Sequence, residues 1–340
     1  MFDQHISRRD WLRWSAAAAV GSTMTSRAQA AVSYADLPTK DYLGEASIVA
    51  AVTTPKFFTE GPAYDGKQYL YFSNVAANQI CRFDTHKGML GELAVFRQNT
   101  NAANGLDFDP DGNLVACEGG TNDQGRVVRI NIKTGSLGVI ADQYEGHRLG
   151  APNDLVINER GTIYFTSRLA NTDPKAGNVN AVYEAHDKGM AHVLKSPNID
   201  MPNGIELSPD EKTLYLVESD GRENKSRCIR AYRVGKWEES RVLIDFYPGR
   251  SGDGMCVDAE GNLYIAAGLH QTRNTSETLD TKPGIHVVTS AGKLVAFVET
   301  PEDTITNCTF GGPDLKTLYV TCGKYLIAIP SQRPGVKRAR

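Results

Sequence analysis

The stretch Gly150-Ala151-Pro152-Asn153-Asp154, with the apolar hairpin from Leu155 to Ser167 that follows it, decides the fold of this chain. A polar residue precedes an apolar strand, a short turn and a second apolar strand. This pattern begins six times, at residues that are 44, 49, 50, 50 and 54 positions apart. Repeats of this length are typical of solenoids, propellers and arrays. The residues that lead the six copies are Glu60, Asn104, Asn153, Asn203, Asp253 and Asn307.

A second pair of short strands fills the remainder of each repeat. In the second copy, for example, Arg126 to Ile130 and Leu137 to Ile140 flank a turn that contains Gly135. Two-residue alternation and short turns dominate, and no extended helical periodicity follows the N-terminal segment. Four strands repeated six times predict an all-β fold, a six-bladed β-propeller with four-stranded blades.

The last repeat is one strand short, because Tyr325 to Ile329 is followed by Pro330 and a polar basic tail. A spare strand, Ser47 to Val52, lies upstream of the first lead residue. We therefore predict that this N-terminal strand becomes the outermost strand of the last blade and closes the ring.

The first 30 residues have the pattern of a twin-arginine signal peptide. Ser7-Arg8-Arg9-Asp10-Trp11-Leu12 precedes a weakly apolar stretch, and Ala28-Gln29-Ala30 fits the rule for signal peptidase. This predicts recognition by the twin-arginine export machinery, a periplasmic or secreted product, and one propeller domain over residues 31–340. The alternative is a cytoplasmic protein with a fortuitous arginine pair. A basic tail from about residue 331 to 340 is expected to fray.

Composition narrows the possible partners. With 37 Lys and Arg against 40 Asp and Glu, the formal net charge is −3, which gives no electrostatic footprint for nucleic acid. No stretch approaches the length of a membrane span. The six cysteines form no Cys-x-x-Cys pair, and most fall inside predicted core strands, so we expect mostly free thiols.

The first strand of each propeller blade lines the central channel, so the six lead residues should converge on one axis. All six carry a side-chain oxygen, and two are carboxylates. Such a ring suits a hard divalent cation, Ca²⁺ first, and a cation would compensate carboxylates that are otherwise costly to bury. The alternative is that Asn and Asp are simply turn formers at strand starts.

The repeated phrases that contain the lead residues, taken together and in register, resemble those of the regucalcin/gluconolactonase family. Its members are six-bladed propellers related to diisopropyl-fluorophosphatase and paraoxonase. The resemblance covers roughly residues 45 to 330. It implies a single divalent ion, Ca²⁺ in preference to Mg²⁺, Mn²⁺ or Zn²⁺, and metal-assisted hydrolysis of a sugar lactone. It also implies that the metal ligands are Glu60, Asn153, Asn203 and Asp253. The phrases that carry it include Thr59-Glu60-Gly61-Pro62, Asn104-Gly105-Leu106, Ala151-Pro152-Asn153-Asp154, Pro202-Asn203-Gly204-Ile205 and Asp253-Gly254-Met255.

The resemblance further implies that Asp253 is the base that activates water. Asn104 is expected to hydrogen-bond the substrate, His147 to shuttle protons from a loop near the channel, and Arg168 to contact an acidic or polyhydroxylated substrate. The loops around the site depart from the family, which leaves the substrate open. Two alternatives are a hydrolase of another ester or phosphotriester, and a non-catalytic sugar- or partner-binding propeller with a structural calcium.

Overall fold

The computed structural model describes residues 32–120, 124–168, 179–186 and 189–338. The chain divides into two units, Met1–Ala30 and Ala31–Arg340, and every element below belongs to the second. The predicted signal peptide lies outside the described residues. In the described part of the chain, no helix is long and apolar enough to cross a membrane.

The strands of the described ranges form six four-stranded antiparallel sheets, each built from strands consecutive in the sequence except the last. The first three sheets are β2 (Thr59–Tyr64), β3 (Tyr69–Asn74), β4 (Gln79–Asp84) and β5 (Leu93–Gln98); β6 (Ala103–Phe108), β7 (Leu114–Glu118), β8 (Arg126–Ile130) and β9 (Leu137–Ala141); and β12 (Ala151–Ile157), β13 (Ile163–Arg168), β14 (Ala181–His186) and β15 (Gly189–Lys195).

The next two sheets are β16 (Pro202–Leu207), β17 (Thr213–Ser219), β18 (Arg227–Arg233) and β19 (Lys236–Asp245); and β20 (Gly252–Val257), β21 (Leu263–Ala267), β22 (Gly284–Val288) and β23 (Leu294–Glu299). The last sheet holds β24 (Ile305–Gly311), β25 (Thr317–Cys322), β26 (Tyr325–Pro330) and β1 (Ser47–Ala51). A two-stranded ribbon, β10 (Gln143–Tyr144) and β11 (His147–Arg148), stands apart from them.

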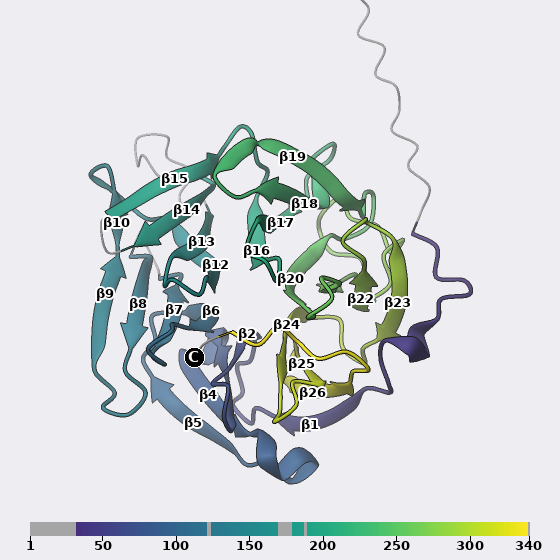
Figure 1. Cartoon of the computed structure of the whole chain (residues 1–340), viewed down its shortest axis with the longest axis horizontal. Coiled ribbons are helices and arrows are strands. Elements are labelled where there is room, and N and C mark those ends of the chain that lie inside the picture. The colour runs from purple at the N-terminus through teal and green to yellow at the C-terminus, as the bar shows by residue number, and fades with distance from the viewer. Residues whose placement is uncertain (1–31, 121–123, 169–178, 187–188, 339–340) are drawn as a thin grey trace, which may run out of the picture. The chain divides into compact units, whose positions relative to one another are not determined.

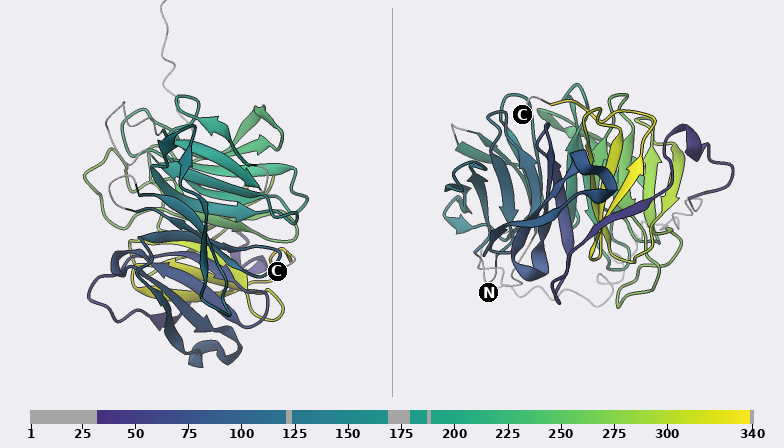
Figure 2. Two further views of the ribbon diagram at one scale, coloured as in Figure 1. Left: turned by 90° about the vertical axis from the view of Figure 1, so that its left-hand side faces the viewer. Right: turned by 90° about the horizontal axis from the view of Figure 1, so that it is seen from below.

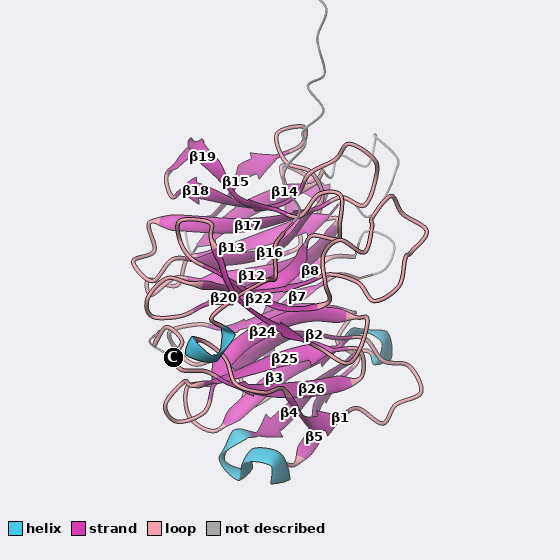
Figure 3. Cartoon of the chain, turned by 90° about the vertical axis from the view of Figure 1, so that its right-hand side faces the viewer, coloured by secondary structure: helices cyan, strands magenta, loops and turns pink. Residues whose placement is uncertain are grey.

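The sheets are arranged as the blades of a propeller. Strands β2, β6, β12, β16, β20 and β24 surround the axis, and each contacts the next around a closed circle (Figure 1). Short 3₁₀ turns η1 (Thr39–Asp41), η2 (Val75–Ala77) and η3 (Thr85–Leu90) are the helical elements of the described residues (Figure 3). The predicted six-bladed, four-stranded propeller is confirmed.

The N-terminal strand closes the ring. β1 pairs antiparallel with β26, with Ser47 opposite Ala328 and Ala51 opposite Tyr325. The N–H of Val52 then donates to the Lys324 carbonyl at 2.9 Å. Strands from opposite ends of the sequence thus share one blade, and the predicted closure is confirmed.

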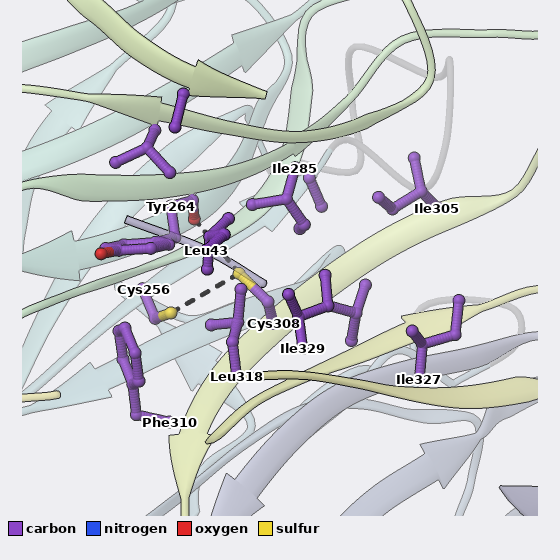
Figure 4. Close-up of a cluster of buried hydrophobic side chains, with 14 of the residues drawn as sticks. Leu43, Cys256, Tyr264, Ile285, Ile305, Cys308, Phe310, Leu318, Ile327 and Ile329 are labelled. Atoms are coloured by element: carbon purple, nitrogen blue, oxygen red, sulfur yellow. Dashed lines mark hydrogen bonds between the residues drawn. The ribbon is translucent and has the colours of Figure 1, made fainter. Parts of the chain in front are cut away.

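Apolar side chains fill the spaces between neighbouring blades. One cluster joins strands of the fifth and sixth blades and includes Tyr264, Leu318 and Ile327 (Figure 4). Within it the sulfur atoms of Cys256 and Cys308 lie 3.5 Å apart as a hydrogen-bonded pair. All six cysteines are buried and free, which agrees with the predicted free thiols.

Through residue 338, the C-terminal tail does not fray, contrary to the expectation from its basic composition. It runs along one face of the ring toward the axis (Figures 1 and 2), and Arg338 donates to the Glu206 carboxylate at 2.5 Å. The side chains of this pair are only 9% and 12% exposed. Burial disfavours the charged guanidinium of Arg338, but attraction to Glu206 and Asp107 outweighs it and raises the pKa of Arg338. The physical reason is therefore an inward-facing carboxylate that needs a buried counter-charge.

Removal of the closing strand should abolish the cooperative fold. A chain that starts at residue 53 leaves β26 as an unpaired edge, and we expect it to lose most of its net stability, about 5–15 kcal/mol for a typical domain. Thermal melting followed by circular dichroism measures this. A chain that starts at residue 32 retains β1 and is the control. An unchanged melting transition in the shorter chain would refute the closure role of β1.

The pairing of the tail can be tested independently. Arg338→Met leaves Glu206 buried without its partner, and the free energy of unfolding should fall by about 3–5 kcal/mol in urea titrations. Arg233→Met breaks the exposed pair with Glu239 and should leave the urea midpoint unchanged. Equal midpoints for the two variants would show that the tail contributes no specific stability.

Candidate metal and substrate site

A cavity of about 590 Å³ opens at one end of the propeller channel. It brings together six of the seven predicted site residues, which come from strands of five different blades. Those that line it are Glu60, Asn104, Asn153, Arg168, Asn203 and Asp253. His147 is not among them, because it lies exposed on the β10–β11 ribbon.

A β-bulge at the start of each inner strand places these side chains in the channel. In β12 the ladder pairs Pro152 with Ser167 and then Leu155 with Phe165, so Asn153 and Asp154 lie between two paired positions. The first strands of the other blades have an irregularity near the same point; in β2 it comes directly after Glu60, which pairs with Ser73. A bulge re-aims side chains that regular pairing would alternate across the sheet.

The predicted position of Asn307 in the ring of lead residues is wrong by one residue. Ile305 pairs with Cys322 and Cys308 with Val320, where the fourth blade pairs Pro202 with Glu218 and Ile205 with Leu216. Thr306 therefore occupies the place of Asn203. The hairpin between these paired positions is one residue longer in the sixth blade, since 16 residues separate Ile305 from Cys322 and 15 separate Pro202 from Glu218.

Asn307 belongs instead to a second layer just inside the cavity. Its Nδ2 donates to the Asp154 carboxylate at 3.2 Å, and it also hydrogen-bonds Glu60. The other positions in this layer include Gly105 and Gly254, whose Cα atoms lie against Asp154 and Asn307 respectively. A Cβ at Gly254 would come within 2.3 Å of the Asn307 amide. The side chains of Asp154 and Asn307 therefore fit in this layer because glycines occupy the positions next to them.

Asp253 is held by two hydrogen bonds. Arg250 donates to its Oδ2 at 2.5 Å, and the Asn203 amide donates to its Oδ1 at 2.5 Å. Arg250 is buried and also donates to the carbonyls of Gly268 and Ile305. This pairing holds the Asp253 carboxylate in one orientation.

Glu60 lies in a very different environment. It is 3% exposed and accepts a hydrogen bond from the Gly61 N–H at 2.8 Å. Burial, followed by repulsion from Asp253 and Asp154, raises its pKa well above the usual range for a carboxyl. Burial raises the pKa of Asp154 to about 7. No cationic side chain of the described residues forms an ion pair with Glu60 or Asp154.

The donor set fits a divalent cation. Two carboxylates and two amides present oxygen ligands, the type that calcium and magnesium bind. Half a turn of the Asn203 amide would offer its oxygen where its nitrogen now contacts Asp253. A cation beside Glu60 would compensate the buried negative charge. In the described ranges no group of three His, Cys, Asp or Glu side chains forms a metal cluster, so any site depends on the amides.

Sequence reasoning missed three cavity residues. Arg222, Arg250 and Arg273 line the same space as Arg168. None of them belongs to the repeated phrase, and arginine in a loop ordinarily indicates only a solvated surface. The one available signal was the position of Arg250, three residues before the lead carboxylate Asp253.

Comparisons with known proteins agree with this architecture. A gluconolactonase of Zymomonas mobilis is 25% identical over 307 residues, covering 82% of this chain and 80% of the relative. Regucalcin of Xenopus laevis is 26% identical over 269 residues, covering 77% and 82%. The structure of a gluconolactonase from Xanthomonas campestris superimposes with a TM-score of 0.69 at 25% identity, over 86% of this chain and 91% of the other.

A calcium-binding regucalcin of Agrobacterium tumefaciens shares the fold, with a TM-score of 0.64 at 18% identity, over 87% of this chain and 98% of the other. Residues 58–324 match the family described as the SMP-30/Gluconolactonase/LRE-like region. This match spans most of the chain, with the first five blades complete and two strands of the sixth. The chain therefore belongs to the SMP-30/gluconolactonase family.

Proposed function

We propose that the protein is a metal-dependent hydrolase that opens a sugar lactone at the mouth of the propeller channel. The observation that carries the proposal is the convergence of Glu60, Asn153, Asn203 and Asp253 on one cavity. Relatives named gluconolactonase that align over most of the chain support the same reaction class.

Individual residues of the chain have separate roles in the proposed reaction. Asp253, oriented by its ion pair with Arg250, is the general base that takes a proton from the attacking water. Asn104 lines the cavity beside the carboxylates and hydrogen-bonds a hydroxyl of the sugar ring. A bound divalent cation supplies polarisation of the lactone carbonyl and stabilises the developing negative charge.

The cation we propose is Ca²⁺, with Mg²⁺, Mn²⁺ and Zn²⁺ as alternatives. Its ligands would be the oxygens of Glu60, Asn153, Asn203 and Asp253, a hard donor set without sulfur or imidazole. A regucalcin with the same fold is described as calcium-binding.

We also propose that the protein acts outside the cytoplasm, in the periplasm or after secretion. The support is the phrase Ser7-Arg8-Arg9-Asp10-Trp11-Leu12 and the small residues that precede Ala31. Export by the twin-arginine route carries folded proteins, which suits a domain that acquires its metal before crossing.

Proton release from glucono-1,5-lactone tests the reaction. Dialysis against a chelator should abolish hydrolysis above the spontaneous rate, and added Ca²⁺ should restore it. Asp253→Asn should lower kcat by about 100-fold or more, because it removes the general base. Glu223→Gln changes another carboxyl group that lines the cavity and should retain full activity.

Full activity in Asp253→Asn with metal still bound would refute the base assignment. Calcium binding without hydrolysis of any lactone, carboxylic ester or phosphotriester would instead identify a binding propeller. Hydrolysis of esters but not of lactones would change the proposed substrate class and leave the proposed site unchanged.

The buried carboxyls predict an unusual pH dependence of the metal-free protein. Native Asp154 retains its proton up to about pH 7, whereas the unfolded carboxyl releases it near its model value of 3.8. Stability should therefore fall as the pH rises from about 4 to about 7, by on the order of 4 kcal/mol, and should not fall further on this account above that range. Chemical unfolding of the chelated protein at several pH values measures this.

Asp154→Asn should weaken that dependence and leave the contribution of Glu60, whose pKa is also raised, while Asp111→Asn, which alters an exposed turn, should not change it. Added Ca²⁺ should raise Tm more at pH 8 than at pH 5, because the cation binds ionised carboxylates. A chelated protein whose stability rises between pH 4 and 7 would contradict this electrostatic account.

A further inference from the structure

Four arginines line the cavity that holds the predicted metal ligands, and they are not equivalent. Arg222 pairs with the buried Asp220 at 2.5 Å, and Arg250 pairs with Asp253 at 2.5 Å. Arg168 and Arg273 have no carboxylate of the described residues within ion-pair distance. These two side chains are therefore the cavity cations whose charge is still available to a ligand.

Arg168 is positioned by its backbone neighbours and not by an acid. It ends β13, is partly buried, and its Nε donates to the carbonyl of Pro202 at 3.1 Å. Burial lowers its pKa, and the carboxylates of Asp253 and Glu60 offset only part of that effect. A guanidinium with only a neutral partner in a desolvated position is costly unless an anion joins it.

Arg273 lies on the connection between β21 and β22, and this connection is fixed against its neighbours. The buried Arg227 donates to Ser276, and it also donates to the carbonyls of Pro248, Gly221 and Arg222. The Ser276 N–H in turn donates to Gly221 at 3.0 Å, and the Thr278 N–H to Pro248 at 3.0 Å. These bonds hold the segment that carries Arg273 as a wall of the cavity.

Arg250 is close enough to repel both Arg168 and Arg273. Burial is the main cause that lowers the pKa of Arg168 and of Arg273, and repulsion by Arg250 lowers both further. With a divalent cation compensating Glu60 and Asp253, the cavity retains three arginines besides the Arg222–Asp220 pair. Only Glu223 and Glu277 oppose them among the acids that line it. The loaded cavity thus has an excess of positive charge.

We propose that the substrate is an anionic lactone, a sugar lactone that bears a carboxylate or phosphate away from its ester carbonyl. Arg168 and Arg273 bind that fixed anionic group, and Arg250 positions Asp253. The planar guanidinium forms paired hydrogen bonds with either oxyanion, which makes arginine suited to both. This inference rests on the proposed lactonase function and adds the substrate class.

The test compares three lactones of similar size on the calcium-loaded protein: neutral glucono-1,5-lactone, a lactone of an aldaric acid with a free carboxylate, and the 6-phosphate of gluconolactone. We expect kcat/KM to be at least about tenfold higher for one anionic lactone than for the neutral one at low salt. The anionic lactone that is preferred identifies the group as carboxylate or phosphate.

Variants separate anion recognition from general charge compensation. Arg168→Gln and Arg273→Gln should each lower kcat/KM for the preferred anionic lactone by about 10- to 100-fold, mainly through KM, and by at least about tenfold more than for the neutral lactone. Arg168→Lys should recover part of the loss. Arg160→Gln, which removes a charge from the turn at the far end of the same blade, is the matched control.

A wild-type preference for the neutral lactone would overturn the inference. So would an equal loss for neutral and anionic lactones in both variants, since that result would assign the arginines to the carboxylates of the site. Calorimetric titration with the open-chain aldarate and 6-phosphogluconate provides a readout without turnover. If no lactone is hydrolysed but one of these anions binds in an Arg168-dependent manner, the lactonase proposal fails while the anion site stands.

Discussion

The rest of the structure depends on the burial of carboxylates along a single axis. Closing six blades into a ring brings Glu60, Asp154 and Asp253 into one desolvated space, where like charges repel and water cannot compensate them. The negative charge of these carboxylates can be compensated in two ways. Asp253 is paired with Arg250, whereas Glu60 has no cationic partner in the described residues and is left for a bound ion.

At the other end of the channel a buried carboxylate is paired with a cationic side chain of the same chain. Glu206 faces the axis three positions after Asn203, and the tail brings Arg338 to it across the face of the ring. At this end the charge of Glu206 is therefore compensated by Arg338, while the other end retains both unpaired acids and unpaired arginines. This asymmetry concentrates binding chemistry at one mouth of a nearly symmetric fold.

Much of the fold could be predicted from the sequence, because repetition is visible without any knowledge of contacts. The four ligand candidates and Asn104 were found because a bulge at the same point of each repeat gives the same local sequence. Asn307 shows the limit of this reasoning. Its phrase aligns with that of Asn203 residue by residue, yet the pairing of β24 with β25 is shifted by one residue, which places Asn307 in the second layer. His147 shows another limit, since proximity in sequence to Asn153 did not place it in the cavity.

The sequence by itself determined the number of blades, the strand that closes the ring and the residue types that face the axis, since all of these follow from a repeated local pattern. Tertiary structure alone decided which charges meet. Arg168, Arg250 and Arg273 come from different segments whose local sequences have no feature in common, and Arg338 reaches Glu206 over a separation of 132 residues. Local patterns encode strands and bulges, but the balance of charge in a cavity depends on distances that only the closed ring establishes.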